Sequence, residues 1–139
     1  SGGVLMPGIE TKILLALKSR IQSIPGGLAI AYPADVYTPT DAAYIAVGRV
    51  NIAPERVFVA SGAHERRGTL TLSHVAPIGQ DQAVYEEAGA KIAAHFPADL
   101  CMNFQGIAVK VVSASHVVDG YRDGAWWRTP VNVFWRCAA

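Results

Sequence analysis

Charged side chains are scarce in this sequence. Of its 139 residues, 12 are Lys or Arg and 11 are Asp or Glu, so charge makes up 17% of the chain, whereas an average globular domain has about 25%. The formal net charge of +1 argues against a protein that binds nucleic acid by bulk electrostatics, because such domains usually have a pI above about 9. Apolar residues make up 51%, which excludes a disordered chain.

Long apolar runs and cysteines are also rare. No stretch approaches the roughly 18 apolar residues that a membrane helix needs, and no charged segment precedes an apolar core, so we expect neither a membrane span nor a secretory signal. The two cysteines are too few for a disulfide framework. We expect free thiols in a reducing compartment, with Cys101 buried as a small hydrophobic residue. The length fits one domain, residues 1–139, in which residues 1–5 resemble a tag remnant or a disordered end.

Motifs for catalysis and cofactor binding are missing. The chain has no phosphate-binding loop, dinucleotide-binding glycine pattern, nucleophile elbow or zinc-protease motif, and its four histidines are scattered. We therefore expect no catalytic residue, no cofactor and no metal ion. A small hydrolase or lyase that uses His64, Glu65 or Cys101 is the alternative. Adjacent residues of a strand point to opposite faces, so a solvated loop is the better interpretation of His64 and Glu65.

Two segments have the periodicity of helices. From Ile9 to Ile24 the apolar residues recur every three or four positions, and Pro25-Gly26-Gly27 follows as a stop signal. This predicts a buried stripe of Ile13, Leu17, Ile21 and Ile24. The second helix is predicted over Asp81 to Phe96, with Val84, Ala88 and Ile92 as its stripe, widened by Tyr85 and Phe96. We expect His95 to interact with the dipole at the end of this helix.

The rest of the chain is typical of strands. β-propensity and alternation predict strands over Ala29–Tyr32, Tyr44–Ile52, Gly68–Val75, Ile107–Val112 and Ala125–Arg136, with a shorter apolar piece over Leu100–Phe104. Asp123-Gly124 is a hairpin signal before the last strand. In that strand Trp127, Val131, Val133 and Trp135 share one face, which we expect to pack against a helix. The order of elements predicts an α+β domain with two helices packed on a mainly antiparallel sheet.

The segment from Pro54 to Arg67 is the candidate interaction site. It contains the apolar triplet Val57-Phe58-Val59, and contiguous exposed apolar residues commonly mark a partner surface. We predict a protein interface with the triplet at its centre and arginines at its rim: Arg56, Val57, Phe58, Val59, Arg66 and Arg67. The alternative is that the triplet lengthens a hairpin folded on its own sheet.

Several turns and strand starts resemble a known family. The segments that carry the resemblance are Ile24-Pro25-Gly26-Gly27, Ala31-Tyr32-Pro33, Pro39, Arg67-Gly68-Thr69-Leu70, Ala94-His95-Phe96-Pro97, Asp123-Gly124-Ala125-Trp126-Trp127 and Pro130-Val131. Together they resemble the tail-terminator-like proteins of siphophages, prophages and gene transfer agents. The resemblance runs from about Ile9 to Arg136, and its motifs are structural.

The resemblance implies a virion assembly protein with no catalytic residues. Such proteins form a ring, usually hexameric, on the last ring of the tail tube, where they stop its growth and meet head-completion proteins. The implied partners are other copies of the chain, the major tail tube protein and a head-completion or connector protein, with neither membrane nor specific nucleic acid. The implied location is the tail-head junction of the virion, after assembly in the host cytoplasm.

Two further interpretations stay open at this point. A head–tail connector or neck protein needs the same kind of α+β ring. A nucleic-acid-binding module would use the tryptophans and five arginines, Arg56, Arg66, Arg67, Arg122 and Arg128. The near balance of charges weakens this second alternative.

Overall fold

The computed structural model describes residues 8–33, 38, 42–48, 51–56 and 64–138. Two helices and nine strands follow one another in these residues. The helices are α1 (Ile9–Gln22) and α2 (Gln82–Ala94). The strands are β1 (Ala29–Ala31), β2 (Tyr44–Val47), β3 (Asn51–Arg56), β4 (His64–Pro77), β5 (Cys101–Phe104), β6 (Ile107–Val111), β7 (His116–Val117), β8 (Tyr121–Asp123) and β9 (Trp126–Ala138).

A long antiparallel ribbon of β4 and β9 forms the centre of the sheet. Its register runs without interruption from Glu65 opposite Ala138 to Pro77 opposite Trp126. β2 and β3 pair with successive parts of β4, while β6, β7 and β8 pair with successive parts of β9. β1 and β5 extend the two edges, and the described strands pair antiparallel except for β1 with β2. The expected α+β domain with a mainly antiparallel sheet is confirmed.

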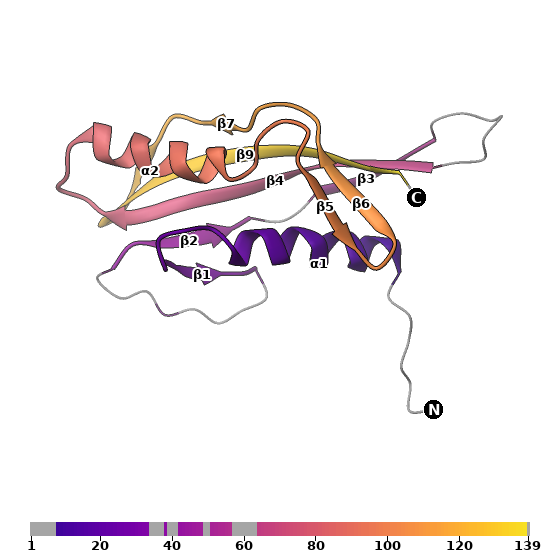
Figure 1. The fold of residues 1–139 in the computed structure, drawn as a ribbon. Coiled ribbons are helices and arrows are strands. Elements are labelled where there is room, and N and C mark those ends of the chain that lie inside the picture. The colour runs from indigo at the N-terminus through magenta and orange to yellow at the C-terminus, as the bar shows by residue number, and fades with distance from the viewer. Residues whose placement is uncertain (1–7, 34–37, 39–41, 49–50, 57–63, 139) are drawn as a thin grey trace.

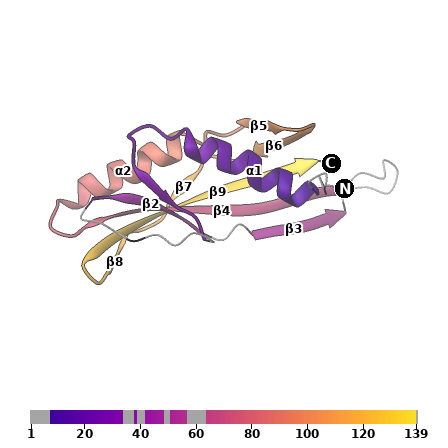
Figure 2. The same ribbon diagram turned by 90° about the horizontal axis from the view of Figure 1, so that it is seen from below.

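Both helices pack on the same face of the curled sheet. α1 lies over the end formed by β5 and β6, and α2 lies over β9, β4 and β7 (Figures 1 and 2). The core between the layers joins Ile13 and Leu17 of α1, Ile92 of α2, and Val133 and Trp135 of β9. Trp135 is 1% exposed, and Val131 and Val133 are fully buried. The predicted inward face of the last strand is therefore confirmed.

The end of α2 is tied to α1 by Arg20. The Arg20 guanidinium donates to the backbone oxygen of His95 through Nε at 3.0 Å and through an Nη at 2.8 Å. His95 Nε2 lies 2.8 Å from Ser23 Oγ and 3.1 Å from the Arg20 oxygen. Burial, with a smaller effect from the Arg20 charge, lowers the pKa of His95, so its ring is a poor charged partner for the helix dipole. The cation at this helix end is Arg20 rather than the expected His95.

The buried stripe of α2 matches the prediction in part: Tyr85, Ile92 and Phe96 are buried as expected, but Val84 is not. Tyr85, Gly89 and Ile92 face the sheet, whereas Val84 is 50% exposed. A Cβ built on Gly89 would lie 2.9 Å from Thr129 Cγ2 and 3.1 Å from Val117 Cγ1. The helix therefore approaches β9 through a residue without a side chain, and this contact turns Val84 away from the core.

The strands depart from the predicted boundaries in two places. The expected strand Tyr44–Ile52 is two strands, β2 and β3, because the register shifts between them. From the pair Val47–Leu72 to the pair Asn51–Thr69 the first strand advances four residues and β4 only three. β4 is longer than expected at 14 residues. The hairpin signal at Asp123-Gly124 is confirmed, since Gly124 has φ +62° between β8 and β9.

Candidate functional site

An apolar groove opens beside α2. It encloses about 870 Å³ between this helix, the turn after α1, and strands β2 and β4. Ile24, Leu28, Ile45, Ala76 and Val84 are among the apolar residues that line it. Val84, half exposed, stands on the α2 side. A surface of this kind is suited to receiving an apolar side chain from another molecule.

Two polar side chains at facing positions of β4 and β9 are buried, and one of them, His74, lines the groove. His74 lines the groove at 8% exposure, and Thr129, its partner across the ribbon, is 1% exposed. Neither His74 Nδ1 nor Thr129 Oγ1 has a hydrogen-bond partner within the described part of the chain. Burial lowers the pKa of His74, which favours the neutral ring. The groove thus has a neutral polar group that can donate or accept one hydrogen bond.

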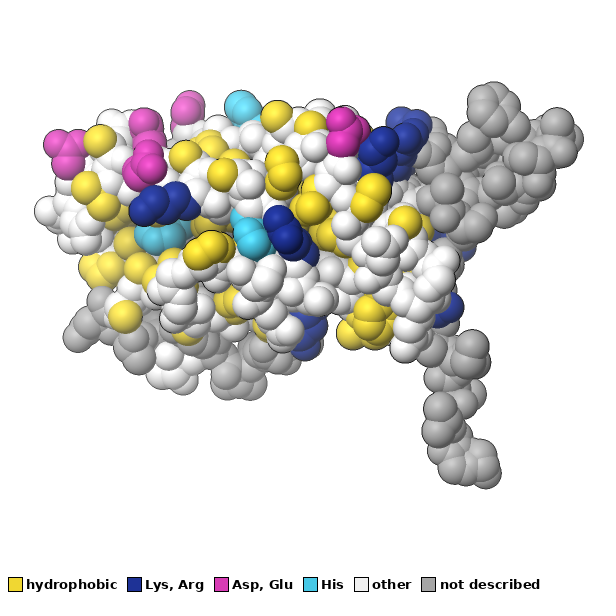
Figure 3. Space-filling view, viewed as in Figure 1, with side chains coloured by type: hydrophobic (Ala, Val, Ile, Leu, Met, Phe, Trp, Pro, Cys, Tyr) yellow, Lys and Arg dark blue, Asp and Glu magenta, His cyan; other side chains and the backbone are white. Residues whose placement is uncertain are grey.

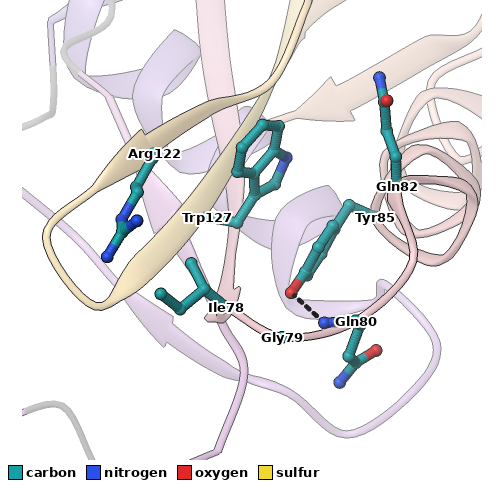
Figure 4. A pocket seen from close by; sticks show the side chains of 7 residues that line it. All are labelled: Ile78, Gly79, Gln80, Gln82, Tyr85, Arg122 and Trp127. Carbon is teal, nitrogen blue, oxygen red and sulfur yellow. Dashed lines mark hydrogen bonds between the residues drawn. The ribbon is translucent and has the colours of Figure 1, made fainter.

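A smaller hollow of about 240 Å³ adjoins the groove and shares Gln80 and Tyr85 with it. Tyr85 and Trp127 stack with ring centroids 5.7 Å apart, as Figure 4 shows beside Ile78 and Arg122. The Tyr85 hydroxyl donates to the Pro77 oxygen at 2.6 Å and accepts from the Gln80 N–H at 3.1 Å. The stacked rings are consequently held in place. Trp127 is thus packed against Tyr85 of α2.

Two large exposed apolar side chains lie at the N-terminal half of α2. Ile78, in the turn before the helix, is 37% exposed, and Val84 is 50% exposed. Acidic side chains lie on the same half of the helix, where Asp81, Glu86 and Glu87 are exposed (Figure 3). We call this end of the molecule the α2 face; it comprises the groove and the exposed side chains of Ile78, Asp81, Val84, Glu86 and Glu87.

Three of the predicted interface residues, Arg56, Arg66 and Arg67, lie at the other end of the β4–β9 ribbon. Arg56 pairs through its backbone with His64 in the β3–β4 hairpin, and the pairing extends through Pro54 opposite Arg66. The described parts of the predicted segment, residues 54–56 and 64–67, are therefore the paired strands of a hairpin stem on the sheet. Val57, Phe58 and Val59 lie outside the described residues.

Arg66 and Arg67 point to opposite faces of the sheet. Arg66 is in register with the buried Cys137 and bonds through Nε to Glu10 Oε1 of α1 at 3.1 Å. Arg67 is exposed on the outer face, opposite Arg136, which is opposite Lys110 of β6. The structure brings these three cations into one row across three strands, with Asp99 3.3 Å from Lys110. Sequence reading missed this row because strand register is needed to see it.

The candidate catalytic residues are not brought together. Cys101 is exposed, which corrects the expectation of a buried thiol, and its Sγ lies 3.8 Å from the Asp99 oxygen. It faces solvent because the inward positions of β5 belong to Met102 and Phe104. His64 and Glu65 begin β4. Over the described ranges, no three His, Cys, Asp or Glu side chains are grouped to hold a metal ion.

Both cysteines are free thiols, and Cys137 is buried. Burial raises the pKa of the Cys137 thiol, an effect that the nearby Arg66 partly offsets. Cys137 is thus an inert core residue. Among the helices described, neither has the length and hydropathy to cross a membrane.

Solved structures with the same fold include a chain of a gene transfer agent particle. One solved chain superposes with a TM-score of 0.75 at 24% sequence identity, over 94% of this chain and 96% of its own length. A chain from the virion of a native gene transfer agent particle superposes with a TM-score of 0.66 at 12% identity, over 96% of this chain and 98% of its own. These likenesses define the fold class: a two-helix, curled-sheet α+β domain that spans nearly the whole chain.

The sequence also matches a family model. The model of the phage tail terminator proteins matches residues 12–135. The chain therefore belongs to the phage tail terminator protein family, and the resemblance seen in its turns and strand starts is confirmed. No curated protein sequence matches it.

Proposed function

We propose that the protein is a structural component of a phage-like particle that forms a ring at the end of the tail tube. In this role it ends polymerisation of the tube at its set length and joins the tail to the head. The family match over residues 12–135 carries the proposal. The likeness to a chain of a gene transfer agent virion over nearly the full length of both chains supports it.

The proposed ring is built from copies of this chain, six in the form implied by the family resemblance. One side of it meets the major tail tube protein, and the other meets a head-completion or connector protein. A closed ring needs a heterologous interface, in which two different surfaces of one subunit meet in its neighbours. We call the end of the molecule where β3 stops at Arg56 and β4 starts at His64 the hairpin end. The α2 face and the hairpin end are two such surfaces, because they lie at opposite ends of the β4–β9 ribbon (Figure 1).

Within this role we propose that the hairpin end docks on a partner through Phe58, with Arg56, Val57, Val59, Arg66 and Arg67 around it. Aromatic residues at the centre of an interface often contribute 2 kcal/mol or more to binding. Arg67, which is exposed, is suited to the polar rim. Arg66 contributes in part by holding the hairpin stem to α1 through Glu10.

The test is complementation of a deletion of the gene in the phage or gene transfer agent that encodes it. Without the protein, electron microscopy should show tubes of uncontrolled length or tails that do not join heads. The wild-type gene and Phe58→Leu, which keeps an apolar side chain, should restore normal particles. Phe58→Asp should give a folded protein that does not.

Three outcomes count against these proposals. Normal particles from the deletion strain would refute the role in tail completion. Normal particles with Phe58→Asp would refute docking through Phe58. A Phe58→Asp protein that unfolds, as judged by circular dichroism, would place Phe58 in the core of its own subunit.

A further inference from the structure

We infer that the apolar groove beside α2 receives the Val57-Phe58-Val59 segment of the neighbouring copy in the ring. The inference rests on the proposed function, since it needs a closed ring of copies, and it names the surface on which the hairpin end docks. The groove is formed by segments that are complete within one subunit. The occupant is proposed to come from the next one.

The position of the groove favours a second copy as its occupant. β3 ends and β4 begins at one end of the β4–β9 ribbon, and β4 runs from there to the turn that leads into α2 (Figure 1). The groove lies at this second end, lined by Pro77, Gln80 and Val84. A segment at one end and its receptor at the other allow each subunit to bind the next in the same direction, which is what a closed ring requires.

The two surfaces are also complementary in hydrophobicity and charge. The lining of the groove is mostly apolar, and the hairpin sequence offers three consecutive apolar residues. From Asp81 to Ala94 the α2 side has three acidic residues and one basic residue, Lys91, which lines the groove, whereas Pro54 to Arg67 has three arginines and two glutamates. The acidic side chains gather over α2 in Figure 3. Opposite charges at the rim would orient the incoming hairpin.

His74 gives the groove a polar group that no other described residue of its subunit satisfies. The residue is 8% exposed, it lines the groove, and its Nδ1 has no partner among the described residues. An extended segment that enters the groove carries one N–H and one C=O on each residue. Either group can bond to His74, so the incoming backbone would satisfy a polar atom that apolar side chains alone would leave buried and unpaired.

Cross-linking in assembled particles tests the contact. Cys101, which is exposed, is replaced by Ser in every variant. Particles are produced from the deletion strain with Phe58→Cys and Val84→Cys in the same chain, purified, and treated with a short bis-maleimide. We expect a ladder of covalent multimers on a denaturing gel. The matched control pairs Phe58→Cys with Leu14→Cys, because Leu14 on α1 is 43% exposed but lies outside the groove.

The results separate the two proposals. Particles that contain the protein at the tail end but give no multimers with the Phe58 and Val84 pair, or equal multimers with the Leu14 control, overturn the groove contact and leave the ring proposal standing. Particles whose tails form and join heads without the protein overturn both.

A second variant covers the case in which the cysteine pair does not assemble. Val84→Glu places a charge in the groove at a half-exposed position, so the subunit should fold while ring formation is lost. Ala90→Glu adds the same charge at an exposed position of the same helix and should assemble normally. Normal assembly of Val84→Glu would overturn the groove contact.

Discussion

The clearest test of the core is Trp135→Ala. Trp135 lies in β9 between β4 and β6 and is 1% exposed in the cluster that joins both helices to the sheet. Truncating a buried Trp to Ala costs about 3–5 kcal/mol, through lost transfer free energy and the cavity that remains. The entropy of unfolding is roughly 0.3 kcal/mol/K for a chain of 139 residues. The melting temperature should therefore fall by about 10–17 °C.

Phe134→Ala is the matched control, because Phe134 is the preceding residue of the same strand, faces the opposite side of the sheet and is 37% exposed. Full burial of a Phe side chain is worth about 1.5–3 kcal/mol, so this variant should lose about 1–2 kcal/mol, or roughly 3–7 °C. Both proteins are melted at the same concentration and followed by circular dichroism, since assembly would make the midpoint depend on concentration. A Trp135→Ala midpoint that falls no further than that of Phe134→Ala would refute the placement of Trp135 in the core.

Two further predictions concern the packing of α2 and the buried His74. Gly89→Val should destabilise the domain by about 1–3 kcal/mol in urea unfolding, because even a Cβ would lie 2.9 Å from Thr129; Ala90→Val on the exposed side should change little, and equal effects would contradict the close approach. Burial lowers the pKa of His74 from 6.5, so the unfolded chain binds more protons and stability should fall as the pH drops below about 6.5. His74→Gln should reduce this fall, and an unchanged loss between pH 7.5 and 5.5 would show that His74 does not contribute.

The sequence by itself determined those helices and strands whose buried face follows from the spacing of their own apolar residues. The stripe of α1 is confirmed at Ile13, Leu17 and Ile21, each at most 2% exposed, because a helix with apolar residues on one side has only one way to bury them. In β9 the inward residues recur at every second position, so the sequence alone identified this face without knowledge of the neighbouring strands. The fold class followed from the order of these elements.

Tertiary contacts decided the features that join distant segments. The stripe of α2 is set by the approach of Gly89 to β9, a contact that hydrophobic periodicity does not register, since glycine carries no apolar side chain. The row of Arg67, Arg136 and Lys110 exists only because long-range strand register aligns them. β4 continues to Pro77 through pairing with β9, beyond the end of its own alternation.

One part of the proposed contact can be recognised in the sequence, whereas the other exists only in the folded structure. The triplet Val57-Phe58-Val59 is visible in the sequence because its three large apolar residues come directly after Glu55-Arg56. Its proposed receptor is not visible there, because the groove is assembled from the turn after α1, from β2, from the end of β4 and from α2. No local window contains these four segments, and only the folding of both helices onto one face of the sheet brings them together around His74.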